Sequence, residues 1–282
     1  MTATYDNETF RERFGPWAVI AGGSDGIGAA FAETLVRRGI NLVLVARDEA
    51  KLAKAADLLR EKYSCEVRCL SSDLTSPDID EQIGSFTSDL DVGLLIYNAG
   101  SGRQMGSFLD HALENWMRQV RLACNGPLAL AHHFGRRLRD RGRGGIVLMS
   151  SLSSLVGGAY IATYSAAKAF DTTLGEGLWQ ELGPSGVDVV SCLAGATDTE
   201  TFRDDTGGSP DAMDPKEVAE GTLDFLGSGP LYVPGAGNRA AAAALMSSTR
   251  IPLINGMSEI NAKNFQLPYT QGKGLEFDEE SA

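Results

Sequence analysis

Short apolar runs alternate along the chain with longer segments in which apolar residues recur at helical spacing. The runs are rich in Val, Ile and Leu, which is typical of strands buried on both faces. In order, the predicted strands are WAVIAG from residue 17, NLVLVA, EVRCL, VGLLIYNAG, GGIVLMSS, VDVVSCLAG and PLYVPG. Helices are expected from Gly26, from about Asp48, after Pro77, over about 110–139, over about 160–182 and near 215–226.

This alternation predicts an α/β fold in which a seven-stranded parallel sheet is covered by helices on both faces. We expect a Rossmann-type doubly wound sheet in a single domain, because no Pro- or Ser-rich linker interrupts the middle of the chain. Ligands of such a sheet bind in the crevice at the carboxyl ends of the strands. Residues that carry chemistry are therefore expected directly after the strands.

The turn after the first predicted strand, AGGSDGIG, is rich in glycine and opens a helix. Gly22, Gly26 and Gly28 are placed as a dinucleotide-binding fingerprint requires. Glycines let the backbone approach a pyrophosphate, and the helix amino terminus supplies N–H donors and positive potential. The alternative is a Gly-rich turn without a ligand, but its position on the first strand of the alternation favours a dinucleotide site.

The segment IATYSAAKAF places Tyr164 and Lys168 four residues apart in a predicted helix. Four residues turn through about 400°, so both side chains lie on one face. A phenol can donate a proton to a carbonyl oxygen, but with an ordinary pKa near ~10 it is reluctant to do so at neutral pH. Lowering this pKa by about three units requires roughly 4 kcal/mol. An ammonium about 4 Å away, at an effective dielectric of about 20, supplies about that much. The structural alternative is a half-buried aromatic beside a snorkelling lysine.

Several motifs follow one another in a specific order: AGGSDGIG, YNAG after the fourth strand, SS after the fifth, and YSAAK opening the next helix. Together they make the chain resemble the short-chain dehydrogenase/reductase family over about residues 15–235. The resemblance implies an oxidoreductase that interconverts a carbonyl and a secondary alcohol by hydride transfer. The reaction would use a nicotinamide dinucleotide and a small-molecule carbonyl or alcohol substrate.

The resemblance also implies the roles of individual residues. Ser151, thirteen residues before Tyr164, would donate a hydrogen bond to the substrate oxygen. Tyr164 would be the general acid/base, and Lys168 would assist it and grip the nicotinamide ribose. The implied cofactor-binding residues are Gly22, Ser24, Gly26, Ile27, Gly28, Arg47, Asp73, Asn98, Ala99, Gly100, Tyr164, Lys168, Gly195 and Thr199. Among them, Asp73 matches a residue that contacts adenine, and Thr199 matches one that binds the carboxamide.

The chain departs from the family pattern at three positions. Ala123 stands where the family usually has an Asn that feeds a proton relay. Asn125 lies two residues on, about 200° around a helix, and cannot simply replace it. Tyr97 and Ala194 take the places of the first Asn of Asn-Asn-Ala-Gly and of a Pro. These departures bear on the efficiency of the relay more than on cofactor binding.

The end of the second predicted strand favours NADP(H) over NAD(H). NAD-preferring relatives have an Asp there, whose carboxylate binds the adenosine ribose and repels a 2′-phosphate. This chain has Ala46 followed by Arg47, and a guanidinium can bind that phosphate in a bidentate way. The alternative is that Arg47 merely begins a solvated helix. Asp25 argues against NADP(H), since some NADP-preferring relatives have a basic residue in that loop.

Composition and charge narrow the partners and the compartment. The chain is 43% hydrophobic and 22% charged, and its net charge of -12 argues against nucleic acid or an anionic membrane as a partner. The acidic start without an apolar stretch argues against a secretory signal, and no run of about 18 apolar residues occurs, so a cytoplasmic protein is expected. No metal is expected, because the four cysteines, Cys65, Cys69, Cys124 and Cys192, lack metal-ligand spacing.

The expected domain organisation is an amino-terminal extension (1–14), the dinucleotide-binding catalytic domain (15–237), an extension packed on the domain or on a neighbouring subunit (238–270) and a disordered acidic tail (271–282). The extension carries apolar surface at Leu245, Met246 and 251–254. We predict that these residues help to close the substrate pocket or cover a neighbouring subunit. A stabilising helix remote from the site is the alternative.

Two further expectations concern assembly and activity. The helices expected at 110–139 and 160–182 form the usual dimer surface of the family, so the resemblance implies a homodimer or homotetramer. The competing functional hypothesis is a dinucleotide-binding regulator or scaffold with little turnover, which Ala123 would permit. The intact Ser151, Tyr164 and Lys168 argue for an enzyme instead.

Overall fold

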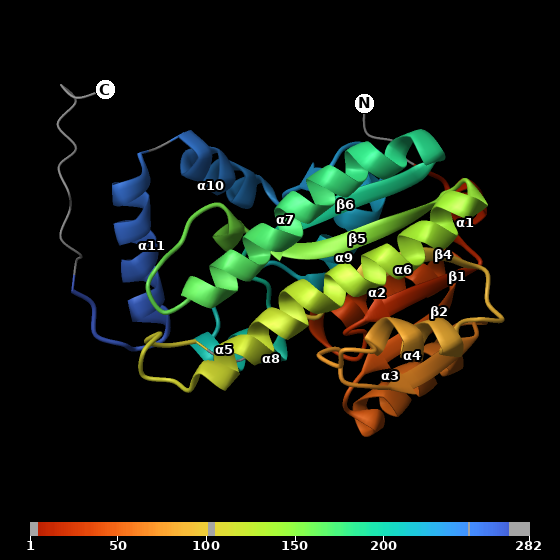
Figure 1. The fold of residues 1–282 in the computed structure, drawn as a ribbon, viewed down its shortest axis with the longest axis horizontal. Helices are drawn as coiled ribbons and strands as arrows, with labels where there is room; N and C mark the ends of the chain where they lie inside the picture. The colour runs from red at the N-terminus through yellow and green to blue at the C-terminus, as the bar shows by residue number, and fades with distance from the viewer. Residues whose placement is uncertain (1–4, 101–104, 248, 271–282) are drawn as a thin grey trace.

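The computed structural model describes residues 5–100, 105–247 and 249–270, and its centre is one parallel sheet (Figure 1). The seven strands are β1 Trp17–Ala21, β2 Asn41–Ala46, β3 Val67–Ser71, β4 Val92–Tyr97, β5 Gly144–Ser151, β6 Val187–Ala194 and β7 Leu231–Tyr232. They lie in the order β3-β2-β1-β4-β5-β6-β7. The chain changes direction across the sheet between β1 and β4, which is the point where a doubly wound fold binds its ligand. The predicted fold is confirmed.

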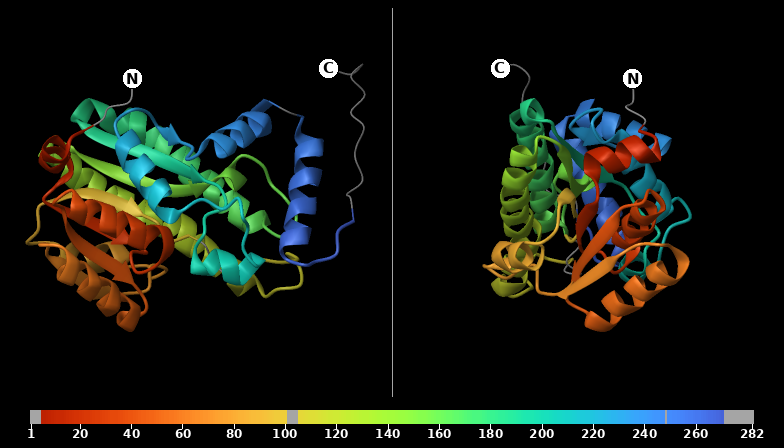
Figure 2. Two further views of the ribbon diagram at one scale, coloured as in Figure 1. Left: turned by 180° about the vertical axis from the view of Figure 1, so that it is seen from behind. Right: turned by 90° about the vertical axis from the view of Figure 1, so that its right-hand side faces the viewer.

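Helices cover both faces of the sheet (Figure 2). One face carries α2 Gly26–Arg37, α3 Glu49–Lys62 and α9 Pro215–Phe225, and the other carries α4 Ile79–Phe86, α6 Gly126–Arg141 and α7 Ala162–Leu182. An aspartate begins each helix of the first face, and its carboxylate accepts a backbone N–H of the first turn. These caps are Asp25, Asp48 and Asp214.

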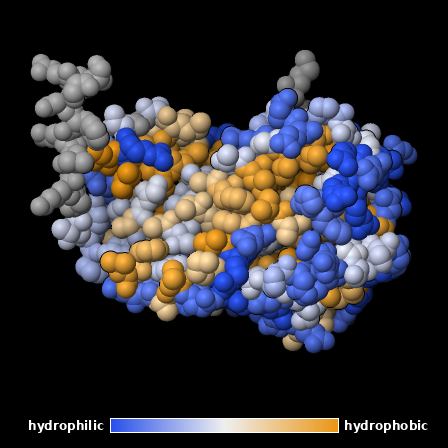
Figure 3. Space-filling view, viewed as in Figure 1, coloured by the Kyte–Doolittle hydropathy of each residue, from blue (hydrophilic) through white to orange (hydrophobic). Residues whose placement is uncertain are grey.

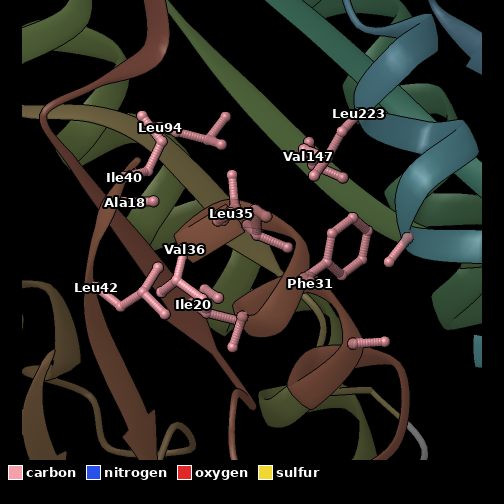
Figure 4. Packing of buried hydrophobic residues seen from close by; sticks show 14 of the residues in the cluster. Ala18, Ile20, Phe31, Leu35, Val36, Ile40, Leu42, Leu94, Val147 and Leu223 are labelled. Atoms are coloured by element: carbon pink, nitrogen blue, oxygen red, sulfur yellow. The ribbon is translucent and has the colours of Figure 1, made fainter. Parts of the chain in front are cut away.

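The packing of α2 fixes the place of the glycine turn. Phe31 and Leu35 are fully buried four residues apart, in one cluster with Val147 of β5 and Leu223 of α9 (Figure 4). Burial of such a side chain stabilises the fold by roughly 1.5–3 kcal/mol. Because this stripe holds α2 against the sheet, the amino end of the helix is held at the carboxyl end of β1.

The described part of the expected amino-terminal extension (1–14) forms a helix that packs on the core through two side chains. This helix is α1 Asn7–Phe14, whose first turn is capped by the carboxylate of Asp6. Phe10 and Phe14 are fully buried, with ring centroids 4.7 Å apart. Two aromatic residues four apart make one apolar face on a helix, and this face packs into the core cluster of α2 and α9.

The long helix expected over about 110–139 consists of two α-helices joined by a π-helical turn. The helices are α5 Leu113–Val120 and α6, and the turn is Arg121–Asn125. The Tyr97 hydroxyl donates to the carbonyl oxygen of Leu122 at 2.5 Å, inside that turn. A side chain that enters the helical hydrogen-bond ladder widens it locally, so Tyr97 accounts for the π turn.

The remaining helices gather at one end of the sheet, beyond the carboxyl ends of the strands (Figure 1). They are α5, α8 Glu200–Thr206, α10 Ala236–Ser247 and α11 Arg250–Asn264. Within the described ranges, no helix combines the length and the apolar character needed to cross a membrane. The predicted acidic tail, 271–282, lies outside the described residues.

Candidate active site

A cleft of about 1080 Å³ lies at the carboxyl ends of the strands. Its walls include nearly all the residues that the sequence singled out. They are Gly22, Ser24, Gly26, Ile27, Arg47, Asp73, Asn98, Ala99, Gly100, Ser151, Tyr164, Lys168, Gly195 and Thr199. Gly28 is the exception, because it does not line the cleft. The fold thus brings together residues that are up to 177 positions apart, from Gly22 to Thr199.

The glycine turn forms a cradle that fits a dinucleotide. Gly22 and Gly26 have φ angles of 85° and 53°, in the left-handed region that favours glycine. A Cβ on Gly28 would lie 1.9 Å from the Gly22 carbonyl oxygen, so Gly28 keeps the turn close to α2 from behind. Asn98 at the end of β4 donates its amide to the same carbonyl oxygen at 2.9 Å. Small residues therefore leave the amino end of α2 open to a phosphate group.

The two serines at the end of β5 have different surroundings. The Ser150 hydroxyl is buried, donates to the Lys168 carbonyl oxygen at 2.8 Å and contacts the Thr172 hydroxyl at 2.7 Å. Ser151 is only partly buried, and its hydroxyl accepts from the Ser153 N–H at 3.2 Å. Ser150 is therefore tied to α7, whereas Ser151 has a donor hydrogen left for a ligand in the cleft.

Tyr164 and Lys168 stand on the first two turns of α7, on the face toward the cleft. The Lys168 side chain is almost completely buried, and its ammonium donates to the Met149 carbonyl oxygen at 2.6 Å and to the Asp171 carboxylate at 3.0 Å. Burial disfavours the charge, but Asp171 and Tyr164 outweigh it and hold the pKa of Lys168 above its usual value. The lysine therefore stays charged in the site. Sequence reasoning missed Asp171, although its spacing of three from Lys168 on a helix was a signal.

Ala123 is fully buried within the π turn, where it presents only a methyl group. Asn125 is exposed and is not among the cleft residues, in line with the expectation that it cannot replace an Asn at 123. A Cβ on Gly126 would lie 2.1 Å from the Tyr97 hydroxyl oxygen, so the glycine makes room for the phenol. The Tyr97 side chain therefore packs against the π turn and the start of α6.

The adenosine end of the cleft is rich in charge. Arg47 is exposed at the end of β2 and makes no ion pair within the described ranges. Lys51 of α3 lies nearby in the cleft wall, with its ammonium 3.5 Å from Asp25 and 3.4 Å from Glu200. Lys51, which sequence reasoning missed, thus supplies a cation beside the acidic residue of the glycine turn.

Asp73 is held by an ion pair that was also missed. Its carboxylate accepts from Arg118 of α5 at 3.1 Å and from the Thr75 N–H at 3.0 Å. Partial burial would raise the pKa of Asp73, but these hydrogen bonds outweigh it and keep the pKa below its usual value. The ion pair joins the ends of β3 and α5 at the rim of the cleft.

Two predicted cofactor-binding residues after β6, Gly195 and Thr199, contact the helices that follow the sheet. Thr199 begins α8, and its hydroxyl accepts from the Phe202 N–H at 3.1 Å. A Cβ on Gly195 would lie 2.3 Å from an oxygen of the Asn238 amide, so α10 approaches the backbone directly there. Both positions connect the cleft to the helices that follow the sheet.

Helix α11 and Phe265, the residue after it, line the cleft with three apolar side chains and two amides. They are Met257, Ile260, Phe265, Asn261 and Asn264. Hydrogen bonds join this helix to the loop before α7: the Ser258 hydroxyl accepts from the Ala159 N–H at 2.9 Å, and the Asn261 amide donates to the Ala159 carbonyl oxygen at 3.0 Å. The extension therefore packs on its own domain, next to the loop that leads to Tyr164.

The residues of the extension that line the cleft differ from those expected. Leu245, Met246 and 251–254 are absent from its wall. Met246, near the end of α10, is 72% exposed. The apolar pattern of the extension indicated that it packs, but the turn between α10 and α11 decides which residues face inward.

Gln119 is a further cleft residue that sequence reasoning missed. It is 2% exposed, lines the cleft from α5, and neither atom of its amide has a hydrogen-bond partner among the described residues. A buried amide of this kind usually has a partner. Its position suits a polar group of a bound ligand, which agrees with the cradle at the glycine turn.

Comparison with known proteins identifies the family of the chain. Residues 16–208 match the model of a family described as short chain dehydrogenase. A 7beta-hydroxysteroid dehydrogenase of Clostridium sardiniense is 33% identical over 236 residues, which cover 82% of this chain and 89% of the relative. A solved structure of a 7beta-hydroxysteroid dehydrogenase, 27% identical, has a TM-score of 0.83 and covers 88% of this chain and 98% of its own.

A short-chain dehydrogenase from Sphingobium yanoikuyae in complex with NADPH has a TM-score of 0.72 and is 33% identical, over 83% of this chain and 96% of that one. The family model alone matches more than half of the sequence. The chain therefore belongs to the short-chain dehydrogenase/reductase family, and it is an NAD(P)-dependent oxidoreductase that acts on CH–OH groups.

Proposed function

We propose that the protein interconverts a ketone and a secondary alcohol with NADP(H), using Tyr164 as general acid/base. The observation that carries this proposal is the meeting of Ser151, Tyr164 and Lys168 in one cleft with the glycine turn. A bound nicotinamide supplies or accepts the hydride. The Ser151 hydroxyl donates a hydrogen bond to the substrate oxygen, and the Tyr164 hydroxyl gives that oxygen a proton in reduction. The Lys168 ammonium stabilises the phenolate that remains.

The preference for NADP(H) rests on the cations at the adenosine end. Arg47 is exposed and unpaired within the described ranges, and Ala46 before it has no carboxylate that would repel a 2′-phosphate. Lys51 adds a second cation and offsets the acidic Asp25 in the glycine turn. The relative from Sphingobium yanoikuyae, which binds NADPH, supports the same preference.

The substrate that suits the cleft is a bulky, largely apolar ketone or alcohol, such as a steroid. Met257, Ile260 and Phe265 add apolar side chains to the same cleft as the catalytic side chains. Apolar walls with a few polar groups are typical of sites for hydrophobic small molecules. The likeness to 7beta-hydroxysteroid dehydrogenases extends over 88% of the chain, which supports a substrate of this size.

The experiment is an assay of a panel of substrates, in which turnover is measured as the loss or gain of NADPH absorbance. It should include a 7-oxo steroid, a long-chain 3-oxoacyl thioester and a small aliphatic ketone, each assayed with NADPH and with NADH. We expect turnover with NADPH and a bulky substrate, and little with the small ketone. Tight NADPH binding without turnover of any compound would favour the regulator or scaffold instead.

A pair of serine variants tests the assignment of Ser151. Ser151→Ala should lower kcat/KM by about a hundredfold with little loss of stability, since only a bond to the reacting oxygen is removed. Ser150→Ala should mainly reduce stability, by about 1–3 kcal/mol, because its buried hydroxyl is tied to Lys168 and Thr172. The opposite pattern would assign the reaction to Ser150.

We also propose that the protein forms a homodimer through α6 and α7, with a tetramer as the alternative. Apolar side chains gather on this face of the molecule (Figure 3). They include Leu128 of α6, 49% exposed, and Trp179 of α7, 38% exposed. Light scattering during gel filtration measures the oligomeric state, and Leu128→Lys should shift a dimer to monomer. A parental protein that runs as a monomer would contradict the proposal.

A further inference from the structure

A buried ion pair lies directly behind the catalytic tyrosine. The ammonium of Lys168 is 3.0 Å from an oxygen of the Asp171 carboxylate, and the two residues are 4% and 1% exposed. A further hydrogen bond joins the ammonium to the Met149 carbonyl oxygen at 2.6 Å. An ammonium has three donors, so these two contacts leave one for Tyr164 or for a ligand in the cleft.

Burying the Asp171 carboxylate costs free energy, and an apolar side chain could fill the same space without that cost. The second oxygen of Asp171 is buried and has no hydrogen-bond partner within the described residues. A buried charge without full hydrogen bonding is unfavourable, and well-packed apolar residues often stabilise a fold as well as a buried ion pair does. The cost therefore indicates that the charge of Asp171 has a purpose in the site.

On another side the ammonium lies next to Gly100, which has no side chain. A Cβ on Gly100 would lie 2.3 Å from the Lys168 nitrogen and 3.9 Å from the Ala123 methyl group. Gly100 thus leaves space for the ammonium. The hydrogen bonds to the Asp171 carboxylate and to the Met149 carbonyl oxygen orient it.

We propose that Asp171 is a positioning residue that orients Lys168 and partly neutralises its charge, so that the Tyr164 hydroxyl keeps its proton to a higher pH. Lys168 alone would favour the phenolate strongly. The adjacent carboxylate weakens this effect. That the Tyr164 hydroxyl gives and takes the proton of the reaction rests on the proposed function.

The other titratable groups around the pair are neutral over the relevant pH range. Burial and the neighbouring Asp171 raise the pKa of Cys124, in the π turn, to about 11. Burial first, and then Asp171, Cys124 and Asp73, raise the pKa of Tyr97 well above its usual value. Of the titratable groups named here around the pair, Lys168 and Asp171 thus carry the charges.

The test is a titration of the Tyr164 hydroxyl in the protein without ligand. Phenolate absorbance is measured against pH for the parent and for Asp171→Asn, and each curve is corrected with the matching variant that also carries Tyr164→Phe. Asp171→Asn keeps an oxygen beside Lys168 but removes the charge. A unit charge several ångströms away at an effective dielectric near 20 changes such a midpoint by about one pH unit or more. We expect the midpoint to fall by about this amount.

Controls separate the charge effect from a structural one. Asp171→Glu retains the charge and should keep the midpoint within about half of that shift. Asp171→Ser also removes the charge in a smaller side chain, and it takes the place of Asp171→Asn if that variant does not fold. The pH profile of kcat/KM for alcohol oxidation should move to lower pH by the same amount as the titration.

An unchanged midpoint in a folded, neutral variant overturns the proposal, even if the melting temperature falls. An equal midpoint shift in Asp171→Glu also overturns it, because the charge would then not be the cause. The titration needs neither cofactor nor turnover. If no ketone is reduced by the parent, the proposed function fails while the titration still decides the role of Asp171.

Discussion

Arg47→Ala should separate the two nicotinamide cofactors. The guanidinium stands at the end of β2, exposed in the cleft wall and without an ion pair in the described ranges, so its removal leaves no buried partner behind. Lys51 cannot take over fully, since Asp25 and Glu200 lie 3.5 Å and 3.4 Å from its ammonium. A hydrogen bond between charged groups contributes roughly 1.5–3 kcal/mol, so NADPH binding should weaken about tenfold to a hundredfold.

The assay is fluorescence titration of the protein with NADPH and with NADH at one ionic strength. NADH, which has no 2′-phosphate, should keep its affinity within about twofold. Arg139→Ala is the matched control, because Arg139 is an exposed arginine of α6 outside the cleft and its loss changes the net charge equally. Equal losses for both cofactors in Arg47→Ala would show that Arg47 maintains the structure and does not bind the phosphate. A loss in the control would point to long-range charge instead.

Three further variants test the acid, the apolar side chains of α11 and an ion-pair network. Tyr164→Phe should lower kcat about 10²–10⁴-fold and leave NADPH affinity within about twofold in the same titration; near-normal turnover would assign the acid elsewhere. Met257→Ala with Ile260→Ala should raise KM for a bulky substrate about tenfold or more with cofactor affinity unchanged, whereas Met246→Ala, outside the cleft, should change neither. The pKa of Glu33 is lowered from 4.5 to about 2, chiefly by a hydrogen bond from the Lys62 ammonium. Its contribution is therefore present above about pH 4.5 and lost as the pH falls toward 2. Glu33→Gln should cost about 1 kcal/mol at pH 7 in urea unfolding, allowing for solvent screening, and a loss that persists at pH 2 would contradict this.

The sheet could be predicted from the sequence because each strand produces a recognisable pattern in its own few residues. A strand of a parallel sheet is buried on both faces and needs a continuous apolar run, and VGLLIY of β4 is buried at every position. The glycine turn is local in the same sense, since Gly22 and Gly26 adopt positive φ angles that other residues rarely adopt. The amino-terminal helix was harder, because only its burial distinguishes α1 from an exposed extension.

The polar partners of the site could not be predicted, because they come from tertiary contacts. Arg118 reaches Asp73 from 45 positions away, and Lys51 reaches Glu200 from 149 positions away. Nothing in the local pattern around either cation indicates its partner. The same holds for α11, whose inward face depends on how the chain turns after α10. Resemblance to a family gave positions that line the cleft, but not the side chains that surround them.

The change at Ala123 shows how far a departure from a family pattern can be interpreted without a structure. A uniform turn of about 100° per residue was assumed for this helix, yet residues 121–125 form a wider π turn into which the Tyr97 hydroxyl donates. Two departures, Tyr97 and Ala123, thus lie together: the phenol donates into the π turn, and Ala123 adds only a buried methyl group to it. Lys168 is held by the Asp171 carboxylate and the Met149 carbonyl oxygen. The two departures from the family pattern are therefore best interpreted together, as one local change where α5 joins α6.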